Sequence, residues 1–128
     1  MSPRALTLEV VTPDGVAVLE DGVEVVILRR RERRFEVGSE IAIFPLHAPL
    51  LVGLAVAPVR YQKGGATVHL AVAAGFSEVM GDRVVIVTPQ CERLPAADLD
   101  PGARAEALCD RWRRGLPSAG RPQDPVGT

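Results

Sequence analysis

Hydrophobic and polar residues alternate along most of the chain up to residue 88, in short runs that turn-forming residues separate. Three such runs open the chain, at residues 6–11, 16–19 and 23–28. Alternation with a period of two is typical of strands that bury one face. TPDG at residues 12–15 adds turn chemistry, because proline fixes φ and glycine accepts a positive φ. This pattern predicts a three-strand meander over residues 6–28.

The alternation continues through the middle of the chain. Residues 59–68 contain two strand-like runs on either side of Gly64 and Gly65, which predicts a hairpin. A glycine inside a strand pattern, such as Gly75, indicates a bulge or the close approach of another backbone. Counting the runs gives roughly nine or ten short strands within about 93 residues, the spacing expected of a sandwich or a barrel. Residues 1–95 are therefore predicted to form an all-β domain.

A helical period appears only near the C-terminus. Asp100 can accept bonds from the free N–H groups at a helix start, and Pro101 suits the first helical position because no donor is needed there. One apolar stripe follows at spacings of three and four residues, formed by Ala105, Leu108 and Trp112. We expect one short helix from Pro101 to Arg114 within a C-terminal segment, residues 96–115. Residues 116–128, rich in proline and glycine, are expected to be a disordered tail.

Charge and composition narrow the classes of function. The chain has 15 lysines and arginines and 16 acidic residues, a formal net charge of −1, which argues against nucleic-acid binding. Its apolar runs are shorter than the ~18 residues of a membrane span, and its first residues show no apolar signal core, so we expect a soluble, cytosolic protein. Cys91 and Cys109 lack metal-ligand or redox-motif spacing and are expected to be reduced thiols.

Residues 29–34 (RRRERR) hold five arginines and one glutamate. Unpaired charge is costly to bury, so this run is predicted to be a solvated hairpin tip or an extended ribbon. Two interpretations follow for its role. The arginines either keep a loop soluble or bind an anionic partner, which is a phosphate or an acidic protein face.

Side chains suited to catalysis are few. His47 and His69 are the only histidines, and Glu78 is the carboxylate that can join them as ligands in a cupin-like barrel, although a clustered ligand spacing is missing. A nucleophile elbow, a phosphate-binding loop and a dinucleotide motif are also missing. We expect no cofactor and favour a binding or structural module. A cupin-like β-sandwich metal enzyme and a free-standing module that binds an anion through the arginine run are the alternatives.

The most distinctive stretch is EIAIFPLHAPLL at residues 40–51, in which two prolines stiffen a turn around a histidine. It resembles the Glu-x-Gly-x-x-Pro-Gly-His-Ala-Pro-Leu-Leu block of the epsilon subunit of F-type ATP synthases. LEVVTP at residues 8–13 is similar to the opening strand of that family. Four further short segments match in the family's order, at residues 59–61, 63–65, 75–79 and 83–84.

The resemblance implies a two-sheet β-sandwich that carries a C-terminal helical hairpin. It also implies a non-catalytic subunit at the foot of the rotating central stalk, where it binds the gamma subunit and the ring of membrane-embedded c subunits. Such a subunit couples proton or sodium ion transport to ATP synthesis or hydrolysis. Contact with the catalytic alpha and beta subunits is expected to be transient or absent. The implied location is peripheral, on the cytoplasmic face of the bacterial inner membrane.

The resemblance also assigns roles to residues. It places Glu40 in the loop that meets the c-ring, and Thr12, His47 and Val52 near the side that faces gamma. The whole expected partner interface consists of Thr12, Glu40, Pro45, His47, Ala48, Pro49 and Val52. The arginine run lies where the family has a shorter loop. Three of its residues are therefore candidates for contact with c-subunit loops or lipid headgroups: Arg30, Arg31 and Arg33.

The chain departs from the family pattern in three further places. Leu46 and Ala42 stand where the family has glycines, so the turn must avoid a positive φ or accept strain. Some members bind ATP through a Leu/Ile-Asp-x-x-Arg-Ala motif, but here one extra residue separates Asp100 from Arg104, which turns Arg104 by about 100° on a helix. We therefore expect a motif remnant without nucleotide binding. The prolines within residues 116–128 leave no room for the second helix with which family members block ATP hydrolysis.

Overall fold

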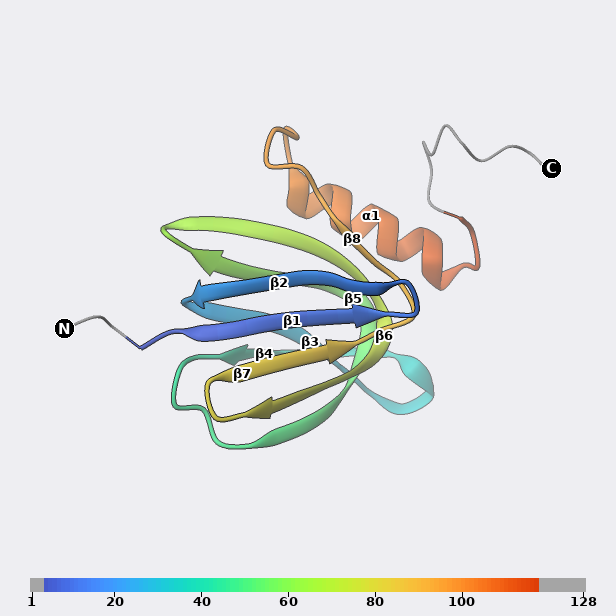
Figure 1. Cartoon of the computed structure of the whole chain (residues 1–128). Helices are drawn as coiled ribbons and strands as arrows, with labels where there is room; N and C mark the ends of the chain where they lie inside the picture. The colour runs from blue at the N-terminus through green and yellow to red at the C-terminus, as the bar shows by residue number, and fades with distance from the viewer. Residues whose placement is uncertain (1–3, 118–128) are drawn as a thin grey trace.

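The computed structural model describes residues 4–117 (Figure 1). This part of the chain contains eight strands, one 3-10 turn and one α-helix. The strands are β1 (Leu6–Thr12), β2 (Gly15–Val23), β3 (Val25–Arg31), β4 (Val37–Ile43), β5 (Leu50–Lys63), β6 (Ala66–Met80), β7 (Arg83–Val87) and β8 (Cys91–Arg93). The 3-10 turn η1 spans Arg33–Phe35, and helix α1 spans Pro101–Arg113. The prediction of a mainly β protein with one C-terminal helix is confirmed.

The strands form one sheet that folds over into two layers. Its order is β2-β1-β7-β6-β5-β3-β4, with β8 paired to β6 outside this path. The fold-over depends on β5 and β6, which are 14 and 15 residues long and belong to both layers. The C-terminal part of β6 pairs with β7, whereas its N-terminal part pairs with β8. Since β2 and β4 end the order without pairing to each other, the architecture is a sandwich rather than a closed barrel.

Two sequence predictions about strands were wrong. The expected meander over residues 6–28 is interrupted, because β3 pairs with β4 and β5 instead of β2. The chain crosses between layers around Glu24, with Val23 and Val25 buried on either side of it. The expected nine or ten strands are eight because Pro58 does not end β5. The ladder between β3 and β5 is interrupted where Pro58 lies, so the missing N–H breaks no regular pair there.

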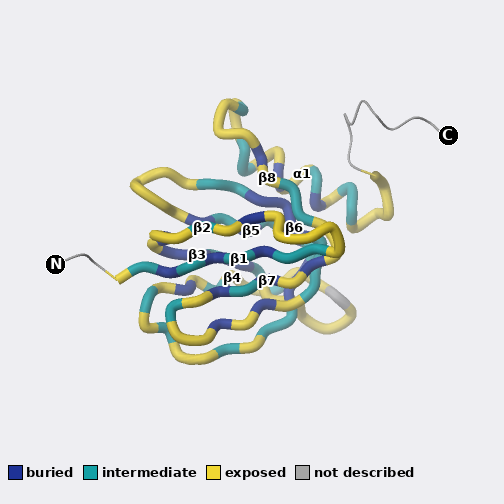
Figure 2. The backbone as a smooth tube through the Cα atoms, in the orientation of Figure 1, coloured by how far each residue is buried: buried dark blue, intermediate teal, exposed yellow. Residues whose placement is uncertain are grey.

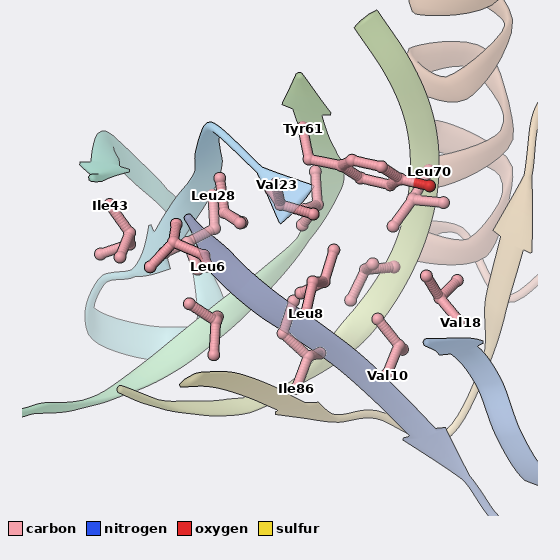
Figure 3. Packing of buried hydrophobic residues seen from close by; sticks show 14 of the residues in the cluster. Leu6, Leu8, Val10, Val18, Val23, Leu28, Ile43, Tyr61, Leu70 and Ile86 are labelled. Atoms are coloured by element: carbon pink, nitrogen blue, oxygen red, sulfur yellow. The ribbon is translucent and has the colours of Figure 1, made fainter. Parts of the chain in front are cut away.

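The core lies between the two layers. Figure 2 shows buried and exposed positions alternating along the strands, and Figure 3 shows side chains from several strands converging in one cluster. Burial of each large aliphatic side chain contributes about 1.5–3 kcal/mol, which makes this cluster the main source of stability. Its largest fully buried members are Leu6, Leu8, Leu28, Ile43, Leu54, Tyr61, Leu70 and Ile86.

Gly75 confirms the predicted close approach of a second backbone. Its φ is +102°, and a Cβ placed on it would lie 1.9 Å from the carbonyl oxygen of Val87. The preceding Ala74 also has a positive φ of 70°. This corner bends β6 from one layer into the other.

Helix α1 packs on the layer that contains β5, β6 and β8. Asp100 caps its N-terminus, since Asp100 Oδ1 accepts a hydrogen bond from the Ala103 N–H at 3.0 Å. Ala105 and Cys109 are buried against the sheet, and Leu108 and Trp112 are partly buried beside them, which confirms the predicted stripe. The expected tail lies mainly at residues 118–128, outside the described residues. Between residues 4 and 117, no helix is long and apolar enough to cross a membrane.

Both cysteines are free, as expected. Cys91 pairs with Val72 across β8 and β6 and packs against the core between the layers. Cys109 packs on the opposite side, in the cluster beneath the helix. Burial raises the pKa of each thiol to about 11, so both remain protonated near neutral pH.

Candidate partner-binding surface

The proline-braced corner between β4 and β5 lies on the surface. Leu46 at its apex is 71% exposed and takes a positive φ of 69°, so the turn adopts the conformation for which the family pattern has glycine. The His47 N–H donates to the Phe44 carbonyl at 3.2 Å and closes the turn. The half-buried His47 ring braces the same turn, because its Nδ1 lies 2.7 Å from the Ala48 carbonyl oxygen.

Asp82 ties this corner to the rest of the sandwich. It sits in the turn between β6 and β7, and its Oδ1 accepts a hydrogen bond from the Leu46 N–H at 2.9 Å. The Arg4 Nε donates to Asp82 Oδ2 at 2.9 Å. The Leu46 N–H, followed by the Arg4 guanidinium, lowers the pKa of the Asp82 carboxyl. The corner is therefore fixed by Asp82 from a distant segment, and Arg4 holds Asp82 in turn.

The predicted interface residues do not form one cluster. Pro45, His47, Ala48 and Pro49 share the corner. Thr12 ends β1, whose opposite end lies beside Asp82, and a strand of this length spans about 20 Å. Val52 is partly buried and its side chain packs against the core, so its place near the side that faces gamma stays a prediction.

Glu40 also differs from the prediction, because it lies within β4 rather than in a loop. It pairs with Arg29 of β3 across the ladder. Its carboxylate accepts two hydrogen bonds from Arg60 of β5, at 2.8 and 3.3 Å. These bonds lower the pKa of Glu40. Strands β3 and β4 stay paired as far as Arg31 and Val37, so the loop of their hairpin lies at residues 32–36 and Glu40 lies within the strand.

The candidate ligands of a metal enzyme are scattered. His47 braces the corner, whereas His69 lies on β6 near the start of α1. There the His69 ring would be 3.2 Å from a Cβ placed on Gly102. Glu78 is exposed near the other end of β6, where it pairs with Val85 of β7. Over residues 4–117, no three His, Cys, Asp or Glu side chains are grouped as metal ligands.

Asp100 and Arg104, the two residues compared with the ATP-binding motif, both make contacts at the start of α1. Asp100 caps α1, and the Arg104 guanidinium lies 3.7 Å from the carboxylate of Asp98. Both side chains therefore have partners within their own segment.

The structure brings together an apolar surface that the sequence analysis missed. On the solvent side of the layer that contains β2, β1, β7 and β6, one row of register partners crosses four strands. We call this the apolar row; it consists of Phe76, Val87, Val11 and Val16. Phe76 is 47% exposed, and further along the same layer Leu51 and Met80 are also exposed. Thr12 and Pro13 line a hollow at the same place, which connects one predicted interface residue to this surface.

A signal for the apolar row was present in the sequence. Residues 76–87 carry apolar side chains at both odd and even positions. A strand with one face on the core and one face in solvent needs apolar residues only at every second position. Phe76 and Val79 illustrate this, since Val79 is buried and Phe76 is exposed. The pattern shows an unusual strand but not which other strands complete the surface.

Comparison with known proteins identifies relatives. The family described as "ATP synthase, Delta/Epsilon chain, beta-sandwich domain" matches residues 5–94. The chain is 39% identical over 113 residues to the ATP synthase epsilon chain of Anoxybacillus flavithermus, covering 88% of this chain and 77% of that one. It is 41% identical over 112 residues to the ATP synthase epsilon chain of Brevibacillus brevis, covering 87% and 77%.

Two solved structures share the fold at low sequence identity. A chain of the Euglena gracilis mitochondrial ATP synthase has a TM-score of 0.62 and 20% identity, covering 97% of this chain and 69% of that one. A chain from the central stalk and c-ring structure of Tetrahymena thermophila mitochondrial ATP synthase has a TM-score of 0.58 and 14% identity, covering 99% and 84%. Because the family match spans most of the sequence and the relatives align over most of their length, this chain belongs to the ATP synthase delta/epsilon chain family.

Proposed function

We propose that the chain is a non-catalytic subunit of the central stalk of an F-type ATP synthase. In this role it binds the gamma subunit and the c-ring and helps couple ion transport to ATP synthesis or hydrolysis. Its relatives are ATP synthase epsilon chains, and the solved structures with this fold come from ATP synthase complexes, one of them a central stalk with its c-ring. The subunit would be peripheral to the membrane, attached through the complex.

The observation that carries this proposal is the apolar row. Phe76 and Val16 lie on paired, hydrogen-bonded strands and yet expose apolar side chains to solvent. A continuous exposed apolar surface on a stable domain marks a protein-binding site. A stiff sheet is suited to gripping a rotating shaft, because its strands transmit torque without rearranging. Gamma is therefore the partner that we assign to this face.

The proposal is tested by co-purification from native membranes. We expect Phe76→Ser combined with Val16→Ser to reduce recovery of gamma and the catalytic subunits at least about tenfold, since two central apolar contacts are lost. Leu99→Ser is the matched control, because Leu99 is fully exposed on the linker before α1. The control should retain both partners, and circular dichroism should show folded protein in each case. Full recovery with the double variant would refute gamma binding through this face.

A further inference from the structure

We infer that the tip of the β3–β4 hairpin binds the phosphate headgroups of an anionic lipid surface. The tip is defined here as residues 29–36, which hold five arginines and two glutamates, a formal charge of +3. The whole chain has a charge of −1, so the remaining residues together carry −4. Positive charge is thus concentrated in one short segment of an otherwise acidic molecule.

The tip projects from the body as a closed turn. In Figure 1 the loop after β3, coloured cyan, extends beyond the sheets on a different side from α1. Two hydrogen bonds shape it, from the Glu32 N–H to the Glu36 carbonyl at 2.7 Å and from the Glu36 N–H to the Arg33 carbonyl at 3.1 Å. The arginines are therefore presented by an ordered hairpin rather than by a loose loop.

The outermost guanidinium groups are available to a partner. Arg33 and Arg34 are exposed, and their side chains form no hydrogen bond or ion pair with any residue that the structure describes. The Glu32 side chain is folded back towards Gly38, since a Cβ placed on Gly38 would lie 2.4 Å from Glu32 Oε2. The same oxygen lies 3.8 Å from the Arg30 Nε. Glu32 therefore leaves the cationic end of the turn uncovered.

The arginines also diverge, which favours a lipid surface over a protein or a single small anion. Arg30 donates to Ser39 Oγ at 3.0 Å on β4, whereas Arg31 covers Gly53 of β5, with its Nη2 2.9 Å from a Cβ placed there. Neighbouring strand residues point to opposite faces, so one pocket cannot collect these groups. Mobile headgroups can rearrange around them, and the planar guanidinium forms paired hydrogen bonds with phosphate.

The acidic remainder of the chain supports an orientation. A negative surface attracts the tip and repels the rest of the molecule, so the chain should approach with the hairpin foremost. Each arginine near an anionic membrane contributes about a fivefold gain in partitioning. Binding should weaken at high salt, because exposed charges are screened.

Vesicle flotation of the full chain tests this inference. We expect it to float with vesicles of phosphatidylcholine and phosphatidylglycerol but not with phosphatidylcholine alone. Arg33→Gln combined with Arg34→Gln should lower partitioning roughly 30-fold. Arg104→Gln with Arg114→Gln, which removes equal charge from exposed positions on α1 and at its C-terminal cap, should leave it within about twofold.

Several results would overturn the inference. These are equal binding to neutral vesicles, no binding to either kind, or an equal loss with the α1 control. A tip variant that loses co-purification with c subunits in detergent would show that the arginines bind protein instead. The test is independent of the proposed stalk function, because flotation requires neither gamma nor c subunits, so failure of one leaves the other standing.

Discussion

Leu46 shows how one residue can be held in an unfavourable conformation at an exposed, proline-braced corner. Its positive φ costs an L-residue about 1–2 kcal/mol, and the hydrogen bond to Asp82 keeps it in place. We expect Leu46→Gly to raise the free energy of unfolding by about 0.5–1 kcal/mol, because the greater freedom of unfolded glycine offsets part of the gain. Chemical denaturation measures this change.

Leu46→Ala is the control for that experiment. Alanine keeps the Cβ that disfavours this φ, and the leucine side chain is mostly exposed, so stability should hardly change. An equal gain from both variants would mean that the exposed side chain, not the backbone, is the source of the cost.

At the scale of elements, the bend in β6 depends on Gly75. We expect Gly75→Ala to lower the free energy of unfolding by about 3 kcal/mol or more, because the new Cβ would overlap the Val87 carbonyl and force β6 and β7 apart. Gly64→Ala is a matched control, since Gly64 also has a positive φ but no atom lies within 4 Å of its would-be Cβ. That change should cost only about 1–2 kcal/mol. Equal losses in urea denaturation would contradict this account.

At the scale of the whole molecule, carboxylates join segments that are far apart in sequence. A hydrogen bond from Lys63 lowers the pKa of Glu20, and one from Arg60 lowers the pKa of Glu40. A folded-state pKa below the unfolded one stabilises the fold above the ordinary value of 4.5 and loses that effect as the pH falls through the lower value. Thermal stability should therefore be steady above about pH 5 and decline below it.

The size of that decline can be assigned to one pair by substitution. Glu20→Gln removes the titrating carboxyl that Lys63 holds at 2.8 Å, so the acid-induced loss should be smaller than in the unchanged chain. Glu24→Gln is the control, an exposed glutamate without an ion-pair partner among residues 4–117. A decline of the same size in all three proteins would show that other carboxyls dominate.

Much of the fold could be predicted because its signals are local. The alternation at Leu6, Leu8 and Val10 shows directly which face of β1 is buried. The start of α1 is equally local, since Asp100 and Pro101 act within one turn of the helix. Pro58 misled the strand count, because its effect depends on whether the neighbouring ladder needs an N–H at that position.

The candidate site could be predicted only in part. The surface position of His47 follows from two nearby prolines, and the solvated arginine tip follows from the cost of burying charge. Glu40 was misplaced because the length of the β3–β4 hairpin depends on how far the two strands continue to pair. The partial burial of Val52 against the core could not be predicted, because it depends on how the two layers pack.

The sequence by itself determined the strand periodicity, the capped helix and the charged tip, because each depends on residues only a few positions apart. Tertiary structure alone decided that β1 lies between β2 and β7, and so placed Val16 and Val11 in one row with Val87 and Phe76. Pairing between distant strands is set by the summed packing of both layers rather than by any local pattern. The surface assigned to gamma therefore exists only once the sheet has closed over its core.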